Sequence, residues 1–193
     1  VPNLRSSSFS SLKAVYLVHI WDQLNQYVIG NDLSLLPPTL EHIELAFFNA
    51  FLFFMENPPI VAKGVDVPSY SNDYIYKSNV ATSFPRLKSL KLTGGIGMHE
   101  SFFASLPSTL EALDVHLTYY PTAFDLAEIS LPSSLRSFKT NITFQHKPSK
   151  NTFPEGLHEL EIGYFPDFSI IEHLPQHLTS LNVDASSDES GHV

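Results

Sequence analysis

The 193-residue sequence contains no cysteine, and this absence excludes disulfides, thiolate metal sites and cysteine nucleophiles. Because secreted domains often rely on disulfides, we expect a cytoplasmic protein, with an extracellular location as the alternative. Basic residues are scarce as well, since 11 Lys and Arg stand against 20 Asp and Glu, for a net charge of −9. Such a chain cannot neutralise a row of phosphates, so we do not expect nucleic acid as a partner.

Long apolar segments are also missing. The longest apolar run, from Leu45 to Met55, is about half the length of a membrane span and is interrupted by Asn49. We therefore expect no membrane insertion. The first ten residues lack the apolar core of a signal peptide, and the chain begins with Val1, so we expect a fragment or a processed form.

Recognisable catalytic and cofactor motifs are absent too. His173 and His177 are four residues apart, but Pro175 between them prevents a helical pair of metal ligands. The glycine-rich segment 94–97 has neither the lysine of a phosphate loop nor the spacing of a dinucleotide fingerprint. It is better explained as a turn that needs a positive φ. The sequence thus predicts no catalytic residue, no metal site, no cofactor and no enzyme activity.

What the sequence does contain is a repeat. The frame L-x-x-L-x-L that begins at Leu87 recurs 23 residues later at Leu110. Eight copies, one of them degenerate, follow each other at steps of 21 to 28 residues, beginning at Leu12, Leu40, Ala62, Leu87, Leu110, Leu135, Leu157 and Leu178. Each alternating triplet predicts a short strand with one buried face. Stacked copies predict a parallel sheet in which one column of side chains is buried, including Leu90, Leu113, Leu160 and Leu181.

Six of the eight copies follow an apolar residue and a proline, as in Leu106-Pro107. With this L-P-x-x-L-x-x-L-x-L form, residues 9–184 resemble the leucine-rich repeat family, in the irregular variants of bacterial effectors and slime-mould proteins. The resemblance implies an α/β solenoid of about eight coils, with a parallel sheet on the concave face and an irregular or short helical convex side. We expect one domain over residues 1–184 and a flexible tail over 185–193, because the tail has no core-forming pattern.

The sequence departs from the family at one position. The family usually places Asn or Cys eight residues after the start of the frame, where the side chain bonds the backbone of a turn. No copy has either residue there, and the positions read Ile20, Phe48, Tyr70, Gly95, Thr118, Thr143, Phe165 and Ser186. We therefore expect irregular coils whose turns satisfy their buried backbone groups in another way.

One outward residue stands between the second and third apolar positions of each copy. A parallel stack brings these residues into one row: Tyr16, Glu44, Asp66, Lys91, Asp114, Lys139, Glu161 and Asn182. From Lys91 onward the signs alternate. Two interpretations stay open. The row is either a docking strip for a partner or a self-neutralising ladder whose pairs contribute about 0.2–1 kcal/mol each.

Large aromatic residues follow several predicted strands, at the loops where binding residues tend to collect. Trp21, Tyr119 and Phe144 each lie nine residues after the start of their frame and should share one rim. Such rings either contact a partner, as interface hot spots do, or pack the turns in place of the missing Asn side chains. The candidate partner-binding residues are Glu44, Asp66, Lys91, Asp114, His116, Lys139, Tyr119, Tyr120, Phe144 and Tyr164.

Leucine-rich repeats generally bind proteins through the concave sheet and its adjoining loops. The resemblance therefore implies a non-catalytic protein-interaction module with a protein partner of unknown identity. An architectural subunit of a larger assembly is the second possibility, and an enzyme with an unrecognised site is the third. Asn141-Ile142-Thr143 is a glycosylation sequon that matters only if the protein is secreted.

Overall fold

A computed structural model describes residues 10–18, 36–46, 80–94, 101–117, 124–145, 148–149, 151–163 and 168–183. The predicted copy at Ala62 and the predicted tail, residues 185–193, lie outside these residues.

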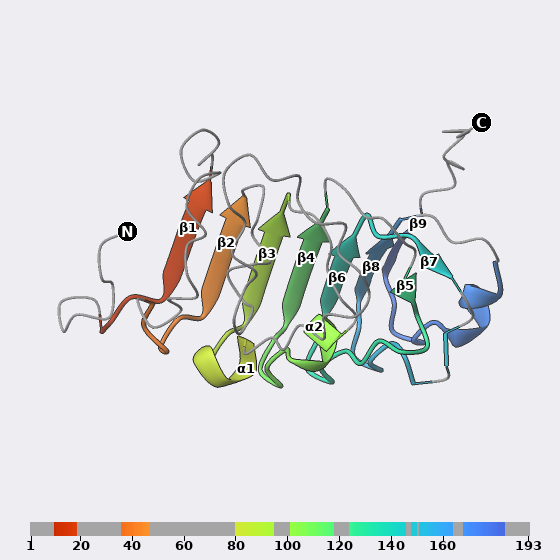
Figure 1. The fold of residues 1–193 in the computed structure, drawn as a ribbon. Helices are drawn as coiled ribbons and strands as arrows, with labels where there is room; N and C mark the ends of the chain where they lie inside the picture. Colours follow the sequence, from red (N-terminus) through yellow and green to blue (C-terminus); the bar gives the residue numbers. More distant parts are fainter. Residues whose placement is uncertain are drawn as a thin grey trace, which may run out of the picture.

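The described residues form a parallel sheet in a solenoid with few helices (Figure 1). Seven strands pair in chain order, namely β1 (Ala14–Val18), β2 (His42–Ala46), β3 (Ser89–Thr93), β4 (Ala112–His116), β6 (Ser137–Thr140), β8 (Glu159–Ile162) and β9 (Ser180–Val183). Two short strands, β5 (Phe124–Asp125) and β7 (Phe144–Gln145), form a second parallel pair. The helical segments are α1 (Val80–Ser83), α2 (Ser101–Ala104) and the 3₁₀ helix η5 (Phe168–His173).

The register of the large sheet follows the repeat frame. Equivalent residues lie side by side in all seven strands, so that Leu90 neighbours Leu113 and Leu160 neighbours Leu181. The middle apolar residue is at most 2% exposed in the five strands from β2 to β8. Leu181 was predicted to be buried as well, but this is wrong, since it is 43% exposed. The reason is its position on β9, an edge strand of the sheet, where no further coil covers it among the described residues.

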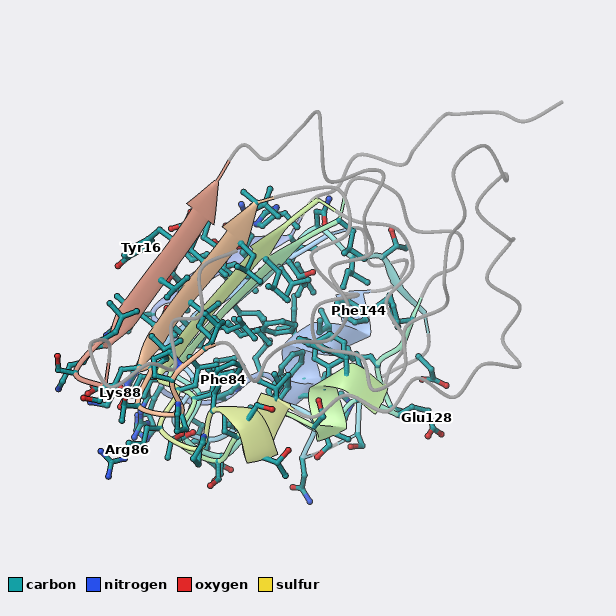
Figure 2. All side chains as sticks on the ribbon, turned by 60° about the vertical axis from the view of Figure 1, so that its left-hand side comes forward. Tyr16, Phe84, Arg86, Lys88, Glu128 and Phe144 are labelled. Atoms are coloured by element: carbon teal, nitrogen blue, oxygen red, sulfur yellow. The ribbon has the colours of Figure 1, made fainter. Side chains whose placement is uncertain are left out.

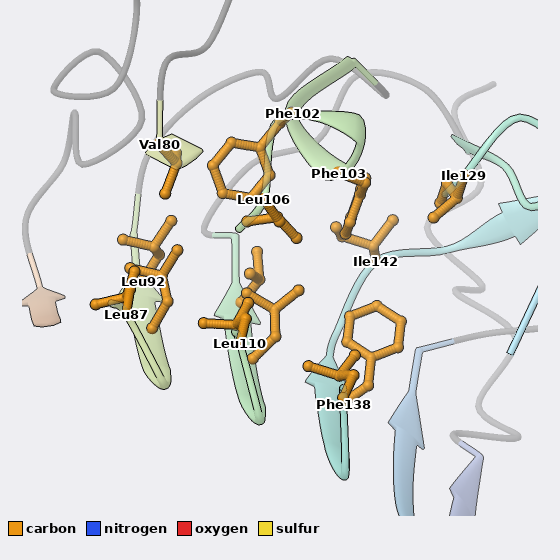
Figure 3. Close-up of a cluster of buried hydrophobic side chains, with 14 of the residues drawn as sticks. Val80, Leu87, Leu92, Phe102, Phe103, Leu106, Leu110, Ile129, Phe138 and Ile142 are labelled. Carbon is orange, nitrogen blue, oxygen red and sulfur yellow. The ribbon is translucent and has the colours of Figure 1, made fainter. Parts of the chain in front are cut away.

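The core lies between the sheet and the segments that carry α1 and α2 (Figure 2). Phe103 from α2 is central to it, because its ring meets three others edge-on at centroid distances of 5.8 to 6.4 Å, those of Phe102, Phe124 and Phe138. Figure 3 shows these helical residues facing the strand residues across the core. Aromatic rings thus fill the space that the irregular outer segments enclose.

A tight turn precedes each strand of the frame from β2 to β9. In each turn the N–H of the leucine that starts the frame donates to the carbonyl three residues earlier, as from Leu110 to Pro107 at 3.1 Å. Hydroxyl groups then link the turns of successive coils. Thr109 Oγ1 donates to the carbonyl of Leu87 at 2.8 Å, and Ser134 Oγ donates to that of Leu110 at 2.6 Å. These hydroxyls satisfy backbone carbonyls at the start of the strands, the end opposite to the missing Asn side chains.

One asparagine does bind turn backbone, two positions earlier than the family pattern places it. The Asn141 side chain accepts from the N–H of Leu117 and donates to its carbonyl, both at 2.7 Å. In the neighbouring coil, a Cβ at Gly163 would lie 2.4 Å from the Asn141 carbonyl, so only glycine fits there. Gly94 has φ of 91° and confirms the predicted positive-φ turn.

The column of middle apolar residues offers a direct test of the frame. Leu113→Ala should cost about 2–5 kcal/mol, because the truncation leaves a cavity between two packed coils. Leu181→Ala, in the same column on the edge strand, should cost clearly less. Chemical denaturation of both variants measures the difference, and near-wild-type stability of Leu113→Ala would contradict the frame.

Candidate interaction surface

The outward residues of the seven strands form one unbroken row on the open face of the sheet, called here the charged row. Its members are Tyr16, Glu44, Lys91, Asp114, Lys139, Glu161 and Asn182. They face outward because strand side chains alternate and their neighbours are buried in the five inner strands. Glu44 pairs directly with Lys91, so Asp66, which lies outside the described residues, has no place between them.

The ion pairs of the charged row show how far it neutralises itself. Lys91 Nζ lies 3.1 Å from Glu44 Oε1 in the next strand, as a ladder requires. Lys139 instead pairs at 2.7 Å with Glu159, which lies on the next strand two residues before Glu161. Glu159 also accepts from Ser137 Oγ at 2.8 Å, and its pKa is lowered by both bonds. The self-neutralising interpretation therefore holds for Glu44 and Lys91 but not for the row as a whole.

Asp114 occupies the middle strand of the seven and has no lysine ion pair among the described residues. Its Oδ1 atom is buried and lies 3.0 Å from His116 Nε2, yet it accepts no hydrogen bond of good alignment in the part of the chain that the structure describes. Burial raises the pKa of Asp114, and the charges of His116, Lys91 and Lys139 oppose that rise.

A second row of alternating charge, not identified from the sequence, lies one residue before the strands. We call it the basal row, and its members are Lys13, Glu41, Lys88, Glu111, Arg136, His158 and Thr179. The N–H of each member donates to the carbonyl of the previous one at 2.7 or 2.8 Å. These residues directly follow the first leucine of each frame, so their alternation could have been read from the sequence.

Glu41 is the most strongly paired member of the basal row. Its two carboxylate oxygens lie 2.7 Å from Lys13 Nζ and 2.8 Å from Lys88 Nζ. These two hydrogen bonds lower the pKa of Glu41 from 4.5 to about 2. Lys88 in turn has a raised pKa because of the hydrogen bond to Glu41. This triad ties the first three strands together at one end.

Taken together, the charges form stripes along the strands. In β2, β3, β4 and β6 the members of the two rows carry the same sign, and the sign changes from one strand to the next. The pairs are Glu41 and Glu44, Lys88 and Lys91, Glu111 and Asp114, and Arg136 and Lys139. Adjacent stripes are about 4.8 Å apart, the usual spacing of paired strands. The open face thus presents an ordered pattern of both signs.

The remaining candidate residues differ in whether they are exposed, buried or outside the described residues. His116 lies on the open face beside Asp114. Phe144 is fully buried in the hydrophobic core, so its predicted contact with a partner is wrong. The other aromatic candidates, Tyr119, Tyr120 and Tyr164, lie outside the described residues, as does Trp21.

No group of three or more His, Asp or Glu side chains in the described residues could hold a metal ion, and none of their helices has the length and apolarity to cross a membrane. Comparisons with protein-family models, curated proteins and solved structures find no match to this chain.

The Glu41 triad predicts a defined acid dependence of stability. Because folding lowers the pKa of Glu41, its pairing stabilises the fold fully above pH 4.5 and loses this effect as the pH falls toward about 2. Glu41→Gln should therefore melt at a lower temperature than the wild type at neutral pH, and the difference should vanish near pH 2. Glu111→Gln, which removes a carboxylate without an ion pair among the described residues, should show a smaller difference. A Glu41→Gln difference that does not change with pH would contradict the triad.

Proposed function

We propose that this chain is a leucine-rich repeat protein that binds a protein partner without catalysing a reaction. Steps of 21 to 28 residues between successive frames other than those at Leu40 and Leu87, the equal register of successive strands and the proline turns before them support the family assignment. The absence of cysteine supports a reducing, cytoplasmic setting, and the net charge of −9 supports a protein rather than a nucleic-acid partner.

The observation that carries the proposal is the charged row. Its side chains Glu44, Lys91, Asp114 and Lys139 are 29% to 44% exposed and project from paired strands rather than from loops. A surface built on paired strands loses little conformational freedom when a partner binds. Alternating signs at fixed spacing favour a partner of complementary pattern and disfavour others, because like charges brought together repel.

Asp114 is the expected centre of recognition. It lies on the middle strand, it has no lysine partner among the described residues, and its charged form is destabilised by burial. A lysine or arginine of the partner placed here would pair with the exposed part of the carboxylate. His116, 3.0 Å away, would then form the edge of the contact.

An architectural role in a larger assembly is the second candidate, because the apolar end of the sheet at β9 is exposed. In that role the end of the solenoid, rather than the charged row, would be covered by other subunits. The two roles can be distinguished by determining whether a bound partner covers the charged row or the end of the solenoid at β9.

The partner can be identified by affinity capture from the native source followed by mass spectrometry, and its binding then measured with purified proteins. Asp114→Lys places three lysines in adjacent positions of the row and should weaken binding at least about tenfold. The fold should survive, because the neighbouring charges are solvated. Unchanged circular dichroism and melting temperature would confirm this.

Glu128→Lys is the matched control, because it makes the same charge change at an exposed residue on the far side of the core from β1 (Figure 2). It should bind as the wild type does. If Asp114→Lys also binds as the wild type does, recognition lies elsewhere on the molecule.

A further inference from the structure

The end of the sheet at β9 exposes apolar side chains that the rest of the solenoid buries. Leu181 is 43% exposed, whereas its equivalents in the five inner strands are at most 2% exposed. Ile171 in η5, which leads into the same coil, is 58% exposed. Both segments lie at the same end of the molecule in Figure 1. This end therefore combines apolar surface with a strand edge that no other described strand pairs, a combination that promotes pairing with another strand.

The opposite end of the sheet does not match it. Val15 on β1 is only 6% exposed although β1 is also an edge strand. A second copy added head to tail would place its β1 beside β9. The apolar side chains exposed on β9 would then face no comparable exposed apolar side chain on β1.

The charges of the strands indicate that β9 of a second copy is the strand best suited to pair with β9. In a two-fold antiparallel pair each strand lies against its own copy, so a charged strand would meet like charges. The inner strands carry charge in one or both rows, and β1 follows Lys13. Residues Leu178 to Val183 carry no charge at all.

We propose that β9 pairs with β9 of a second copy of this chain to form a symmetric dimer with one continuous sheet. The two-fold axis runs perpendicular to the sheet, because only then do both cores lie on the same side. The Leu181 side chains of the two copies meet across this axis and bury each other. The dimer closes on itself, so it does not grow into a filament.

The proposed dimer is independent of the charged row, which stays exposed in both copies. Each copy carries a net charge of −9, and the resulting repulsion opposes association. Screening by salt weakens this repulsion, so the dimer should become tighter as ionic strength rises. An assembly held mainly by ion pairs would respond in the opposite direction.

Sedimentation velocity over a wide concentration range tests the proposal with the full chain. The wild type should be in a monomer–dimer equilibrium that shifts toward the dimer with salt. Leu181→Lys should weaken dimerisation at least about tenfold, because it places two lysines against each other. Tyr16→Lys is the control, since it makes an equivalent change at a 64% exposed residue on the opposite edge strand. It should leave the dimer unchanged.

A wild type that stays monomeric at every concentration would overturn the proposal. So would oligomers larger than a dimer, which indicate head-to-tail stacking, or an equal loss of dimer in Tyr16→Lys. Loss of partner capture in Asp114→Lys has no bearing on these outcomes, so the dimer and the proposed function fail separately.

Cross-linking provides a second readout that does not depend on a disruptive substitution. Because the chain has no cysteine, Asn182→Cys introduces its only thiol, on the exposed side of β9. A short bismaleimide should join two copies of Asn182→Cys covalently and should leave Tyr16→Cys as a monomer. Equal cross-linking of both variants, or none of Asn182→Cys, would contradict pairing through β9.

Discussion

Every feature of this molecule depends on one constraint, which is that parallel pairing in register places each residue beside its equivalent in the next coil. The backbone bonds before each strand impose it, since each basal residue donates to the carbonyl of the previous one. For apolar positions the constraint is favourable, because leucines such as Leu90 and Leu113 stack into a continuous core. For charged positions it is unfavourable unless neighbouring coils differ in sign. The alternation in both rows is the solution that this sequence uses.

The same constraint makes the ends of the solenoid different from its middle. An inner coil covers the apolar face of each neighbour, whereas an edge coil leaves one face to solvent or to another molecule. Leu181 has the same position in its strand as Leu160, yet one is exposed and the other is fully buried. Burial in a solenoid therefore follows from the place of the coil as well as from the residue type. The frame alone could not distinguish these two leucines.

Much of the fold was predictable because two periods in the sequence coincide. The alternation within each triplet sets the buried face, and the repeat step sets the register. The members of the charged row from Glu44 to Glu161 could therefore be aligned from the sequence. Asp66, which was expected between Glu44 and Lys91, lies outside the described residues. Ion pairing was less predictable. Lys139 pairs diagonally with Glu159 rather than with Glu161 directly beside it. A long side chain has several carboxylates within reach, and the spacing along one row does not determine which of them it pairs with. Phe144 shows a similar limit, since an aromatic ring after a strand can face either the turn or the core.

The predicted coil at Ala62 shows how the charges could have corrected the frame. A strand inserted there between β2 and β3 would place Asp66 beside Glu44 in the charged row and Lys63 beside Lys88 in the basal row. Both contacts would place like charges on strands about 4.8 Å apart. The inserted strand would also separate Glu41 from Lys88, whose side-chain atoms Oε2 and Nζ lie 2.8 Å apart because β2 and β3 pair directly. Insertion would replace the ion pairs of Glu41 with Lys88 and of Glu44 with Lys91 by two other opposite-charge neighbours, Glu41 with Lys63 and Asp66 with Lys91. The two like-charge contacts would be added to these, and each of these repulsions is small. The sign pattern thus favours the observed pairing, although the 47-residue step from Leu40 to Leu87 is long enough for another coil.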